Sequence, residues 1–336
     1  MADALDRLAG DSEIVGVLAE RPMLAVTVDG ADPAVTARLA RLTSDLPCVT
    51  VGIASEPLAS PPAFDVLLAT GPAATRPWVA CPDSDLDTTL GALAAGIERS
   101  PQAATTLVQV LRLGRGRSLE EGLTIESFAY ATLQSGAEHR AWLAALRSPS
   151  PRPSTRAEPV VLTREDTTLV VTLRRPEVRN AVDAATRDGL VAAFDLGARD
   201  TTIRQLELRG AGPDFCSGGD LGEFGTTPDP ALGHLVRSTR SPARALARCA
   251  DRTTAHVHGA CIGAGLELAA LAGQVVARPD ARFQLPEVAM GLIPGAGGTA
   301  TIPRRIGREL TAWMALTGAA VDAPTALRWG LVDAVG

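Results

Sequence analysis

Two glutamates lie in apolar, glycine-rich stretches of the sequence. Glu267 follows the segment 258–265, which reads His-Gly-Ala-Cys-Ile-Gly-Ala-Gly, and Glu287 stands between Pro286 and a glycine-rich turn. Burial raises the pKa of a carboxyl group, and two neighbouring carboxylates each raise the proton affinity of the other. Such a pair can work as a general acid and a general base near neutral pH. The alternative for Glu267 is a side chain that only caps its own helix.

Two glycine-rich turns could present backbone N–H groups to a negatively charged oxygen. The first is 213–221, where Gly218-Gly219 lets the chain turn with its amides exposed just after a predicted strand. The second is 258–265, which opens a predicted helix whose first-turn amides have no intrahelical partner and lie at the positive end of the dipole. Both favour an oxyanion or a polarised carbonyl, and for the first turn a purely structural role is the equal alternative.

The sequence gives weaker support for a nucleophilic, a dinucleotide-binding or a metal site. Cys216 and Ser217 could be nucleophiles, but no Gly-x-Ser-x-Gly turn surrounds them, which favours structural roles. The segment 295–300 matches a loose dinucleotide-binding pattern without following a buried β-type run, so we treat the match as accidental. The four histidines have no metal-ligand spacing, and structural roles are expected for His256 and His258. We therefore expect no metal site.

Composition excludes several classes of protein. The chain has 336 residues and a net charge of -6, and all 32 basic residues are arginine. Without lysine there can be no Walker-A phosphate loop, no Schiff-base lysine and no pyridoxal-phosphate anchor. The acidic balance and an aromatic content of 3% argue against a nucleic-acid partner. An apolar content of 46% is typical of a globular protein.

The same features indicate a cytoplasmic protein without a membrane partner. The N-terminus carries early acids and no apolar run, and the 5 cysteines are odd in number and never spaced Cys-x-x-Cys, as expected for reduced thiols. The stretch 253–277 approaches membrane length but contains Glu267, whose insertion would cost about 2.5–3.5 kcal/mol. We expect it to be buried core instead.

The length predicts two units, since about 150 residues per domain is usual. A Pro/Ser-rich linker at 148–158 separates them. We expect a small α/β region over 1–80, with strands at 23–28, 49–53 and 64–69 and a helix over 33–42. A helical region follows over 81–147, with a break near Ser135-Gly136. After the linker, 159–336 alternates predicted strands at 169–173, 203–208, 255–258 and 275–277 with predicted helices at 184–196, 266–271, 309–316 and 323–328.

Taken together, the motifs in this last region resemble the enoyl-CoA hydratase/isomerase (crotonase) superfamily. The resemblance covers essentially all of 160–336, with several motifs in the family's order and spacing. The matching segments are 175–181 (Arg-Pro-Glu-Val-Arg-Asn-Ala), 215–221 (Phe-Cys-Ser-Gly-Gly-Asp-Leu), 259–265, 286–287, 293–299 (Ile-Pro-Gly-Ala-Gly-Gly-Thr), 316–318 and 329–333.

The resemblance implies an α/β spiral of ββα units that binds an acyl-CoA thioester, with coenzyme A as part of the substrate and no other cofactor. The backbone N–H groups of Gly219 and Ala264 would hold the thioester oxygen. Glu267 would orient and deprotonate a water, and Glu287 would protonate the α-carbon. Ala264 stands where the family more often has glycine. The implied coenzyme A contacts are Arg179, Ala181, Asp220 and Leu221, and Gly295 would offer a water-facing amide.

Possession of both acids favours a hydratase, or a dehydratase in reverse, over a double-bond isomerase. A non-catalytic subunit that binds acyl-CoA or a homologous partner chain is a third reading. The family also implies a homo-oligomer, a trimer or a hexamer, with a hetero-partner as a further option. The pocket wall should include Phe224, parts of 226–245 and helices from the N-terminal half.

The family's helical tail, which normally follows the core, resembles residues 82–146 of this chain instead. We therefore expect a circular-permutation-like arrangement, or a duplicated unit that has lost its middle, with 1–80 as a remnant of its start. This hypothesis predicts that Gly336 lies near residues 82–86 and that helices from 118–146 lie near the acyl-CoA site. A detached N-terminal domain would contradict it.

Overall fold

The computed structural model describes residues 15–336 with the exception of 30–33, 35, 39–40, 42–44, 59–60, 72–74, 82, 147–157 and 228. The linker predicted at 148–158 therefore lies outside the described residues, apart from Glu158. The helix predicted over 33–42 is described only at residues 34, 36–38 and 41, which are helical.

The N-terminal region contains a parallel four-stranded sheet in the order β1-β2-β3-β4. Its two inner strands are buried along their whole length, which explains their uninterrupted apolar sequence. The three strands predicted here are confirmed with small shifts at their ends. The bounds are η2 Val17–Ala19, β1 Met23–Thr27, β2 Val49–Ala54, β3 Val66–Ala69 and β4 Val79–Ala80.

A helical region follows this sheet, as predicted. Ser118 and Glu121 form a reciprocal capping box that starts α5. The chain leaves this helix at Ser135-Gly136, so the predicted break is confirmed. The elements are η3 Asp83–Asp85, α3 Leu86–Arg99, α4 Pro101–Leu113, α5 Leu119–Gln134 and α6 Ala137–Ala145.

The C-terminal part carries a six-stranded sheet in the order β13-β10-β8-β7-β6-β5, parallel except for the edge pair β5–β6. A second sheet, β12-β11-β9, mixes one parallel and one antiparallel pair. The expected α/β class is therefore confirmed. The strands are β5 Val160–Glu165, β6 Thr168–Leu173, β7 Gln205–Gly210, β8 Thr253–Val257, β9 Ala260–Ile262, β10 Gln274–Ala277, β11 Arg282–Gln284, β12 Val321–Asp322 and β13 Ala334–Val335.

Helices cover these sheets and carry most of the site described below. Asp183, Asp229 and Ser241 accept backbone N–H groups at the starts of α7, α8 and α9. The helices are η4 Pro176–Val178, α7 Ala184–Arg199, α8 Pro230–Thr239, α9 Pro242–Ala247, η5 Ala250–Arg252, α10 Ala264–Ala269, η6 Glu287–Met290, α11 Gly298–Ile306, α12 Arg308–Thr317 and α13 Ala323–Trp329.

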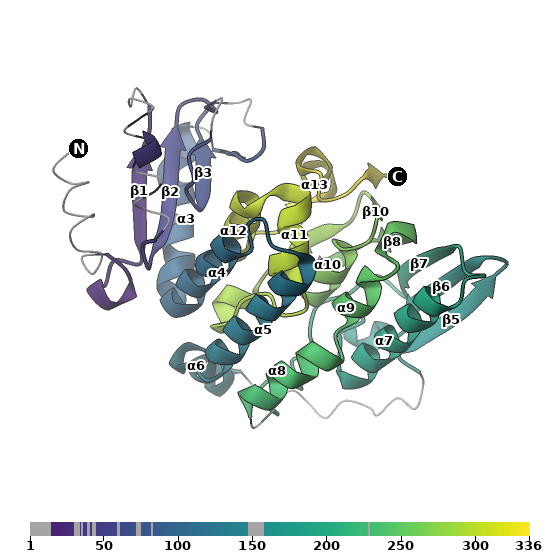
Figure 1. The fold of residues 1–336 in the computed structure, drawn as a ribbon. Coiled ribbons are helices and arrows are strands. Elements are labelled where there is room, and N and C mark those ends of the chain that lie inside the picture. The colour runs from purple at the N-terminus through teal and green to yellow at the C-terminus, as the bar shows by residue number, and fades with distance from the viewer. Residues whose placement is uncertain are drawn as a thin grey trace.

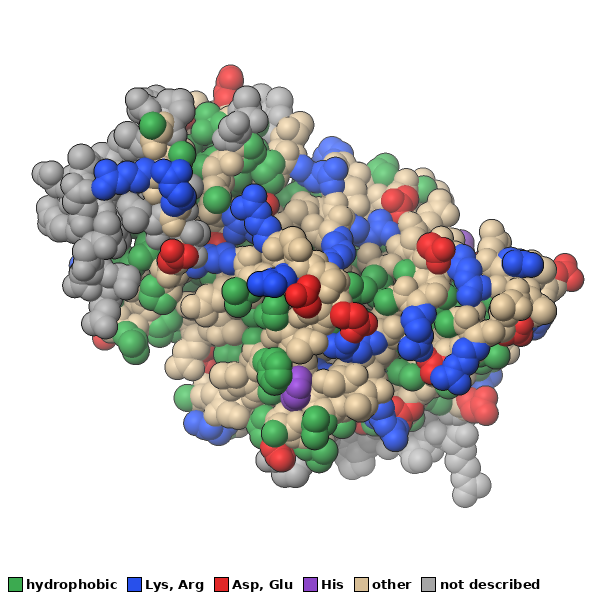
Figure 2. All heavy atoms as spheres, in the orientation of Figure 1, with side chains coloured by type: hydrophobic (Ala, Val, Ile, Leu, Met, Phe, Trp, Pro, Cys, Tyr) green, Lys and Arg blue, Asp and Glu red, His purple; other side chains and the backbone are tan. Residues whose placement is uncertain are grey.

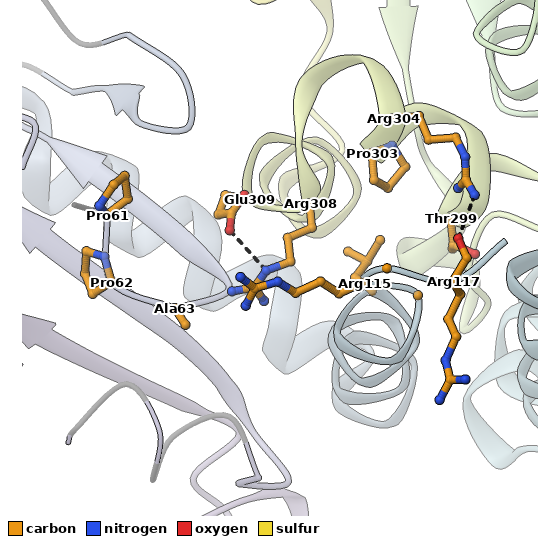
Figure 3. A pocket seen from close by; sticks show the side chains of 13 residues that line it. Pro61, Pro62, Ala63, Arg115, Arg117, Thr299, Pro303, Arg304, Arg308 and Glu309 are labelled. Carbon is orange, nitrogen blue, oxygen red and sulfur yellow. Dashed lines mark hydrogen bonds and ion pairs between the residues drawn. The ribbon is translucent and has the colours of Figure 1, made fainter. Parts of the chain in front are cut away.

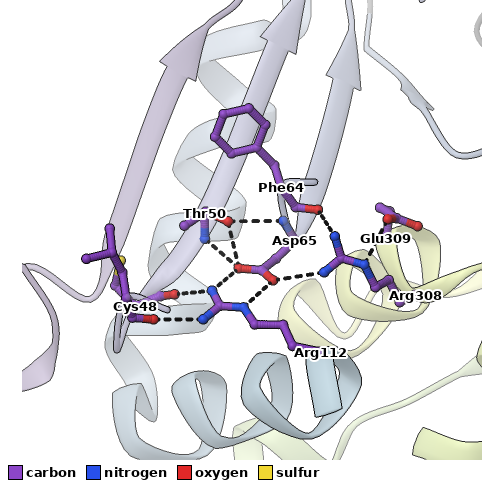
Figure 4. A network of polar contacts seen from close by, with 8 residues as sticks. Cys48, Thr50, Phe64, Asp65, Arg112, Arg308 and Glu309 are labelled. Carbon is purple, nitrogen blue, oxygen red and sulfur yellow. Dashed lines mark hydrogen bonds and ion pairs between the residues drawn. The ribbon is translucent and has the colours of Figure 1, made fainter. Parts of the chain in front are cut away.

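The N-terminal region is joined to the C-terminal part through both apolar and polar contacts. One apolar cluster runs from Val49 in β2 to Val332 near the chain end. Buried Asp65 accepts hydrogen bonds from the guanidinium of Arg112 on α4, with Nε–Oδ1 at 2.9 Å, and lies 3.4 Å from Nη1 of Arg308 on α12 (Figure 4). The detached N-terminal domain considered above is therefore not observed.

The helices α5 and α6 lie against the C-terminal part, where α5 packs on α8 and α11 (Figure 1). The C-terminal end lies beside α13 and β10, whereas residues 83–86 lead into α3, which packs on α12 (Figure 1). These contacts do not support the predicted proximity of Gly336 to residues 82–86. None of the helices described is long and apolar enough to cross a membrane.

Candidate active site

The structure brings the predicted acids and amides together. Glu267, Glu287, Gly219 and Ala264 all line one cavity of about 240 Å³. Four separate segments meet here: the turn after β7, the start of α10, the 3-10 helix η6 and the loop before α11. Also in its lining are the predicted residues Asp220 and Gly295, together with Tyr130, Gln134, Val182, Arg187, Glu223, Phe224, Arg237 and Ala296.

Two backbone amides at this cavity are free to donate. No acceptor in the described part of the chain takes the N–H of Gly219 or of Ala264. The first follows Gly218, whose φ of 100° is accessible to glycine at little cost. The second opens α10 after Gly263, where φ is 50°. Both residues are only partly buried, so their amides can meet an oxygen that enters the cavity.

Glu267 is 2% exposed and does not cap its own helix. Its Oε2 accepts the backbone N–H groups of Ala296 and Gly298, each at 2.7 Å, in the loop that leads into α11. Burial raises the pKa of Glu267 to about 7, and these hydrogen bonds oppose the shift. A carboxyl group with this pKa is divided between both protonation states at neutral pH and can accept or return a proton.

Glu287 is 9% exposed, and its Oε2 has no hydrogen-bond partner in the described part of the chain. A Cβ added at Gly263 would stand 2.6 Å from its Oε1, so only glycine leaves room for this carboxyl. Burial, and next the charge of Glu267, raise the pKa of Glu287 well above its usual value. This shift favours the protonated form of Glu287, which can act as a proton donor.

A third buried carboxyl, Glu126, belongs to the same cluster, and sequence reasoning missed it as a site residue. It comes from α5 and is 2% exposed. Oε1 accepts from Gly297 N at 2.7 Å, and Oε2 accepts from the backbone N and the hydroxyl of Thr299 at 2.8 and 2.7 Å. Burial, and next the charge of Glu267, raise the pKa of Glu126 to about 8. Its position in a predicted amphipathic helix gave no signal of this contact.

The residues predicted to contact coenzyme A divide into two groups. Asp220 and Gly295 line the cavity, although the carboxylate of Asp220 is also paired with Arg175 at 3.1 Å. Arg179 is paired with Asp214 at 2.6 Å, and Ala181 is buried. Together with Leu221, these two do not line the cavity.

The structure also accounts for three motifs set aside above. The thiol of Cys216 is fully buried, and burial raises its pKa to about 12, which disfavours a thiolate nucleophile. The amides of the dinucleotide-like loop 295–299 are bound by two glutamates, so the loop cannot offer them to a pyrophosphate. None of the 5 cysteines, all of which are buried, forms a disulfide, and His258 is hydrogen-bonded to the carbonyl of Gly212.

Aromatic and basic side chains form the rest of the cavity wall. Phe224 lines it, as predicted, and lies near Trp142 of α6 with ring centroids 5.7 Å apart. Tyr130 of α5 packs against Gly295, where an added Cβ would come within 2.4 Å of its ring. The guanidinium of Arg237 on α8 lies 4.5 Å from the centre of that ring. Helix α5 thus supplies one side of the cavity, and α6 supports Phe224 from behind through Trp142.

A larger cavity, of about 530 Å³, lies between the N-terminal region and the helices α11 and α12 (Figure 3). Its arginines are largely engaged, since Arg304 donates to the carbonyl of Arg117 and Arg308 is paired with Glu309. None of the predicted site residues lines it. Size alone therefore does not identify the chemical site, and the convergence of acids and free amides does.

The C-terminal part of the chain is similar in sequence to known proteins. A family model described as enoyl-CoA hydratase/isomerase matches residues 163–336. The 2,3-dehydroadipyl-CoA hydratase of Escherichia coli K12 is 36% identical over 177 residues, which are 52% of this chain and 68% of that protein. The 1,2-epoxyphenylacetyl-CoA isomerase of the same strain is 36% identical over 168 residues, covering 49% and 64% of the two chains. Matches to such relatives thus span about two thirds of their length.

The chain is also similar to solved structures of proteins with these descriptions. An enoyl-CoA hydratase/isomerase from Mycobacterium paratuberculosis matches with a TM-score of 0.50 and 30% identity, covering 54% of this chain and 73% of that one. A similar likeness is found to an enoyl-CoA hydratase/carnithine racemase from Magnetospirillum magneticum, with a TM-score of 0.50 and 28% identity over 53% and 68% of the chains.

Proposed function

The chain belongs to the enoyl-CoA hydratase/isomerase family, and from this we propose that it adds water to a 2-enoyl-CoA thioester, or eliminates water in the reverse direction. The observation that carries the proposal is the meeting of two free amides and two buried carboxyls with raised pKa values in one cavity. Relatives named as hydratases support the same reaction class.

The N–H groups of Gly219 and Ala264 would bind the thioester oxygen and stabilise the enolate-like charge. Loss of one such donor costs about 2.7–4 kcal/mol of barrier in well-studied enzymes. Ionised Glu267 would take a proton from water as the water oxygen bonds to the β-carbon. Protonated Glu287 would deliver its proton to the α-carbon. Elimination runs through the same transfers in reverse.

Double-bond isomerisation is the second candidate, and one observation favours it. Oε2 of Glu267 already accepts two backbone amides, whereas Oε2 of Glu287 has no partner in the described part of the chain. A single base at Glu287 could carry a proton between the α- and γ-carbons. A relative named as an isomerase supports this candidate as well.

We also propose that the helical region 83–146 takes the place of the family's tail within the same chain. The supporting contacts are those of Glu126 with the loop before α11 and of Tyr130 with Gly295. Self-association as a trimer or a hexamer is part of the proposal. The exposed apolar side chains Phe128, Leu232 and Leu235 on α5 and α8 offer a surface for it (Figure 2). Light scattering after size exclusion would measure the assembly.

The test of activity is a panel of 2-enoyl and 3-enoyl-CoA thioesters, followed by loss of the conjugated-enoyl absorbance and by product mass. Hydration adds the mass of one water, whereas isomerisation leaves the mass unchanged. Hydration requires both acids, so Glu267→Gln and Glu287→Gln should each lower kcat by about 10²–10⁴-fold. An isomerase would keep most of its rate in Glu267→Gln. Binding of acyl-CoA without turnover of any thioester would instead support a non-catalytic subunit.

A further inference from the structure

Arg237 on α8 is a partly buried cation at the wall of the candidate active site, and no acidic side chain among the described residues pairs with it. It lines both the 240 Å³ cavity and an adjoining cavity of about 170 Å³. Its hydrogen bonds go to neutral groups: Nε to Ser127 Oγ at 3.2 Å, Nη1 to Gln134 Oε1 at 3.3 Å and Nη2 to the Ser127 carbonyl at 3.5 Å. The ring of Tyr130 covers it on one side.

The hydrogen bonds of Arg237 satisfy N–H groups of its guanidinium but do not neutralise its positive charge. No carboxylate in the described part of the chain forms an ion pair with Arg237. Burial lowers the pKa of Arg237, and the nearby Tyr130 and Glu126 oppose this shift only in part. Both Glu126 oxygens already accept hydrogen bonds from the loop before α11. Glu223, which lines the same cavity, accepts the N–H of Ala184 instead.

The other arginine of this cavity differs in its partner. Arg187 donates two hydrogen bonds to Oδ1 of Asp188, and Arg240 is paired with the second oxygen of that carboxylate at 2.8 Å. Arg187 therefore has a countercharge, whereas Arg237 has none within the ranges that the structure describes. A buried charge is costly unless it is paired, so a charged side chain kept in this place indicates a partner that arrives with the ligand.

Resting on the proposed function, we propose that Arg237 determines substrate specificity by binding a carboxylate at the far end of the acyl chain, so that the preferred substrates are ω-carboxylated 2-enoyl-CoA thioesters. The guanidinium lies in the same cavity as Glu267 and Glu287, so a chain held at the amides of Gly219 and Ala264 has this cation in its wall. Carboxylate and guanidinium form charge-assisted, often bidentate hydrogen bonds. A phosphate of coenzyme A is the other anion that could reach Arg237.

The experiment compares pairs of 2-enoyl-CoA thioesters of equal length that end either in a carboxylate or in a methyl group, over a range of lengths. Each pair is also made as the pantetheine thioester, which lacks the nucleotide phosphates. Wild type, Arg237→Gln and Arg237→Lys are measured. The matched control is Arg244→Gln, because Arg244 also ties α5 to its neighbour, through Thr124 and Glu120, but does not line either cavity.

At the preferred chain length, wild type should have a higher kcat/KM for the carboxylated thioester than for the methyl-ended one. The difference should come mainly from a lower KM for the carboxylated thioester. Arg237→Gln should lose about 10–100-fold in kcat/KM on that substrate and change little on the methyl-ended one. Arg237→Lys should recover part of the loss, and Arg244→Gln should keep the wild-type preference. The same pattern should persist in the pantetheine series.

Two results overturn the inference. One is a wild-type enzyme that hydrates methyl-ended thioesters as well as carboxylated ones at every length. The other is an equal loss in Arg237→Gln on both members that disappears in the pantetheine series, which assigns the arginine to a coenzyme A phosphate. If no thioester reacts, the proposed function fails by itself. Calorimetric binding of the saturated carboxylated and methyl-ended acyl-CoA pair then tests the preference separately, and equal affinities would refute it.

Discussion

Glu126 and Glu267 bind alternate backbone amides of residues 296–299, where the loop passes into α11. Ala296 and Gly298 donate to Glu267, and Gly297 and Thr299 donate to Glu126. One glutamate comes from the N-terminal helical region and the other from α10, so the two parts of the chain meet at the N-terminus of α11. The loop that holds Glu267 is in turn held by Glu126. We infer that the helical region fixes the geometry of the proposed base.

The first prediction concerns this arrangement. Glu126→Gln places an amide NH2 against backbone donors and should loosen the loop that holds Glu267. A misplacement of about 1 Å at a reacting group can cost about 10²-fold in rate, so kcat should fall by about 10–100-fold with KM little changed. Steady-state kinetics on the best thioester measures this. Glu121→Gln, on the same helix in an exposed capping box, is the control and should leave kcat unchanged. Equal rates in both variants would disprove the role.

The second prediction concerns pH and stability. Glu267 and Glu126 have folded pKa values of about 7 and about 8, above their ordinary value of 4.5. The folded state therefore binds more protons than the unfolded state in this range, and the free energy of unfolding should fall as the pH rises through these values. Burial lowers the pKa of His256 from 6.5. His256 therefore makes the free energy of unfolding rise with pH, but only below about pH 6.5.

Urea unfolding at several pH values between about 6.5 and about 8 would measure this slope. The double variant Glu126→Gln/Glu267→Gln should reduce this slope, whatever its absolute stability, and Glu287 should keep the remainder. A wild-type free energy of unfolding that rises with pH over this range would contradict the assignment.

The third prediction concerns the space around Glu267. Gly298 stands in α11, and an added Cβ would meet Glu267 Cγ at 2.6 Å and Pro294 Cβ at 2.8 Å. Gly298→Ala should therefore cost about 1–3 kcal/mol of stability and lower activity, because Glu267 has to move. Gly91→Ala in α3 is the matched control, since nothing lies within 4 Å of its added Cβ. That helical substitution should stabilise by about 0.5–1 kcal/mol. Thermal unfolding separates the two outcomes.

The fourth prediction concerns the junction of the two regions. Asp65 is 2% exposed and faces the guanidinium groups of Arg112 and Arg308. Asp65→Asn would remove the buried carboxylate that both arginines face, although Arg308 keeps its pairing with Glu309, and should cost about 3–5 kcal/mol. The exposed pair of Arg117 and Glu121 is the control, and Arg117→Gln should change stability by less than about 1 kcal/mol. Wild type should unfold in one transition because the regions share a core. Two separate transitions would show that they are independent.

Local patterns in the sequence were sufficient for much of the fold. The uninterrupted apolar run of β2, the helical spacing through 87–146 and the break at Ser135-Gly136 are properties of neighbouring residues, and each appears in the structure. The positions of Glu267 and Glu287 among apolar residues and glycines were enough to predict two buried acids. Short elements such as the 3-residue strand β9 and the 6-residue helix α9 were missed because so few residues leave no periodic signal.

Tertiary structure alone decided which further residues join the site and how they are paired. The sequence determined that acids and glycine turns were present, and the motif order predicted which ones would converge. It did not determine that Glu126 would join them, that Arg179 would be paired with Asp214 outside the cavity, or that Arg237 would lack a countercharge. Each of these depends on contacts between elements far apart in the chain, where burial and the placement of partners set the charge and the pKa of a group.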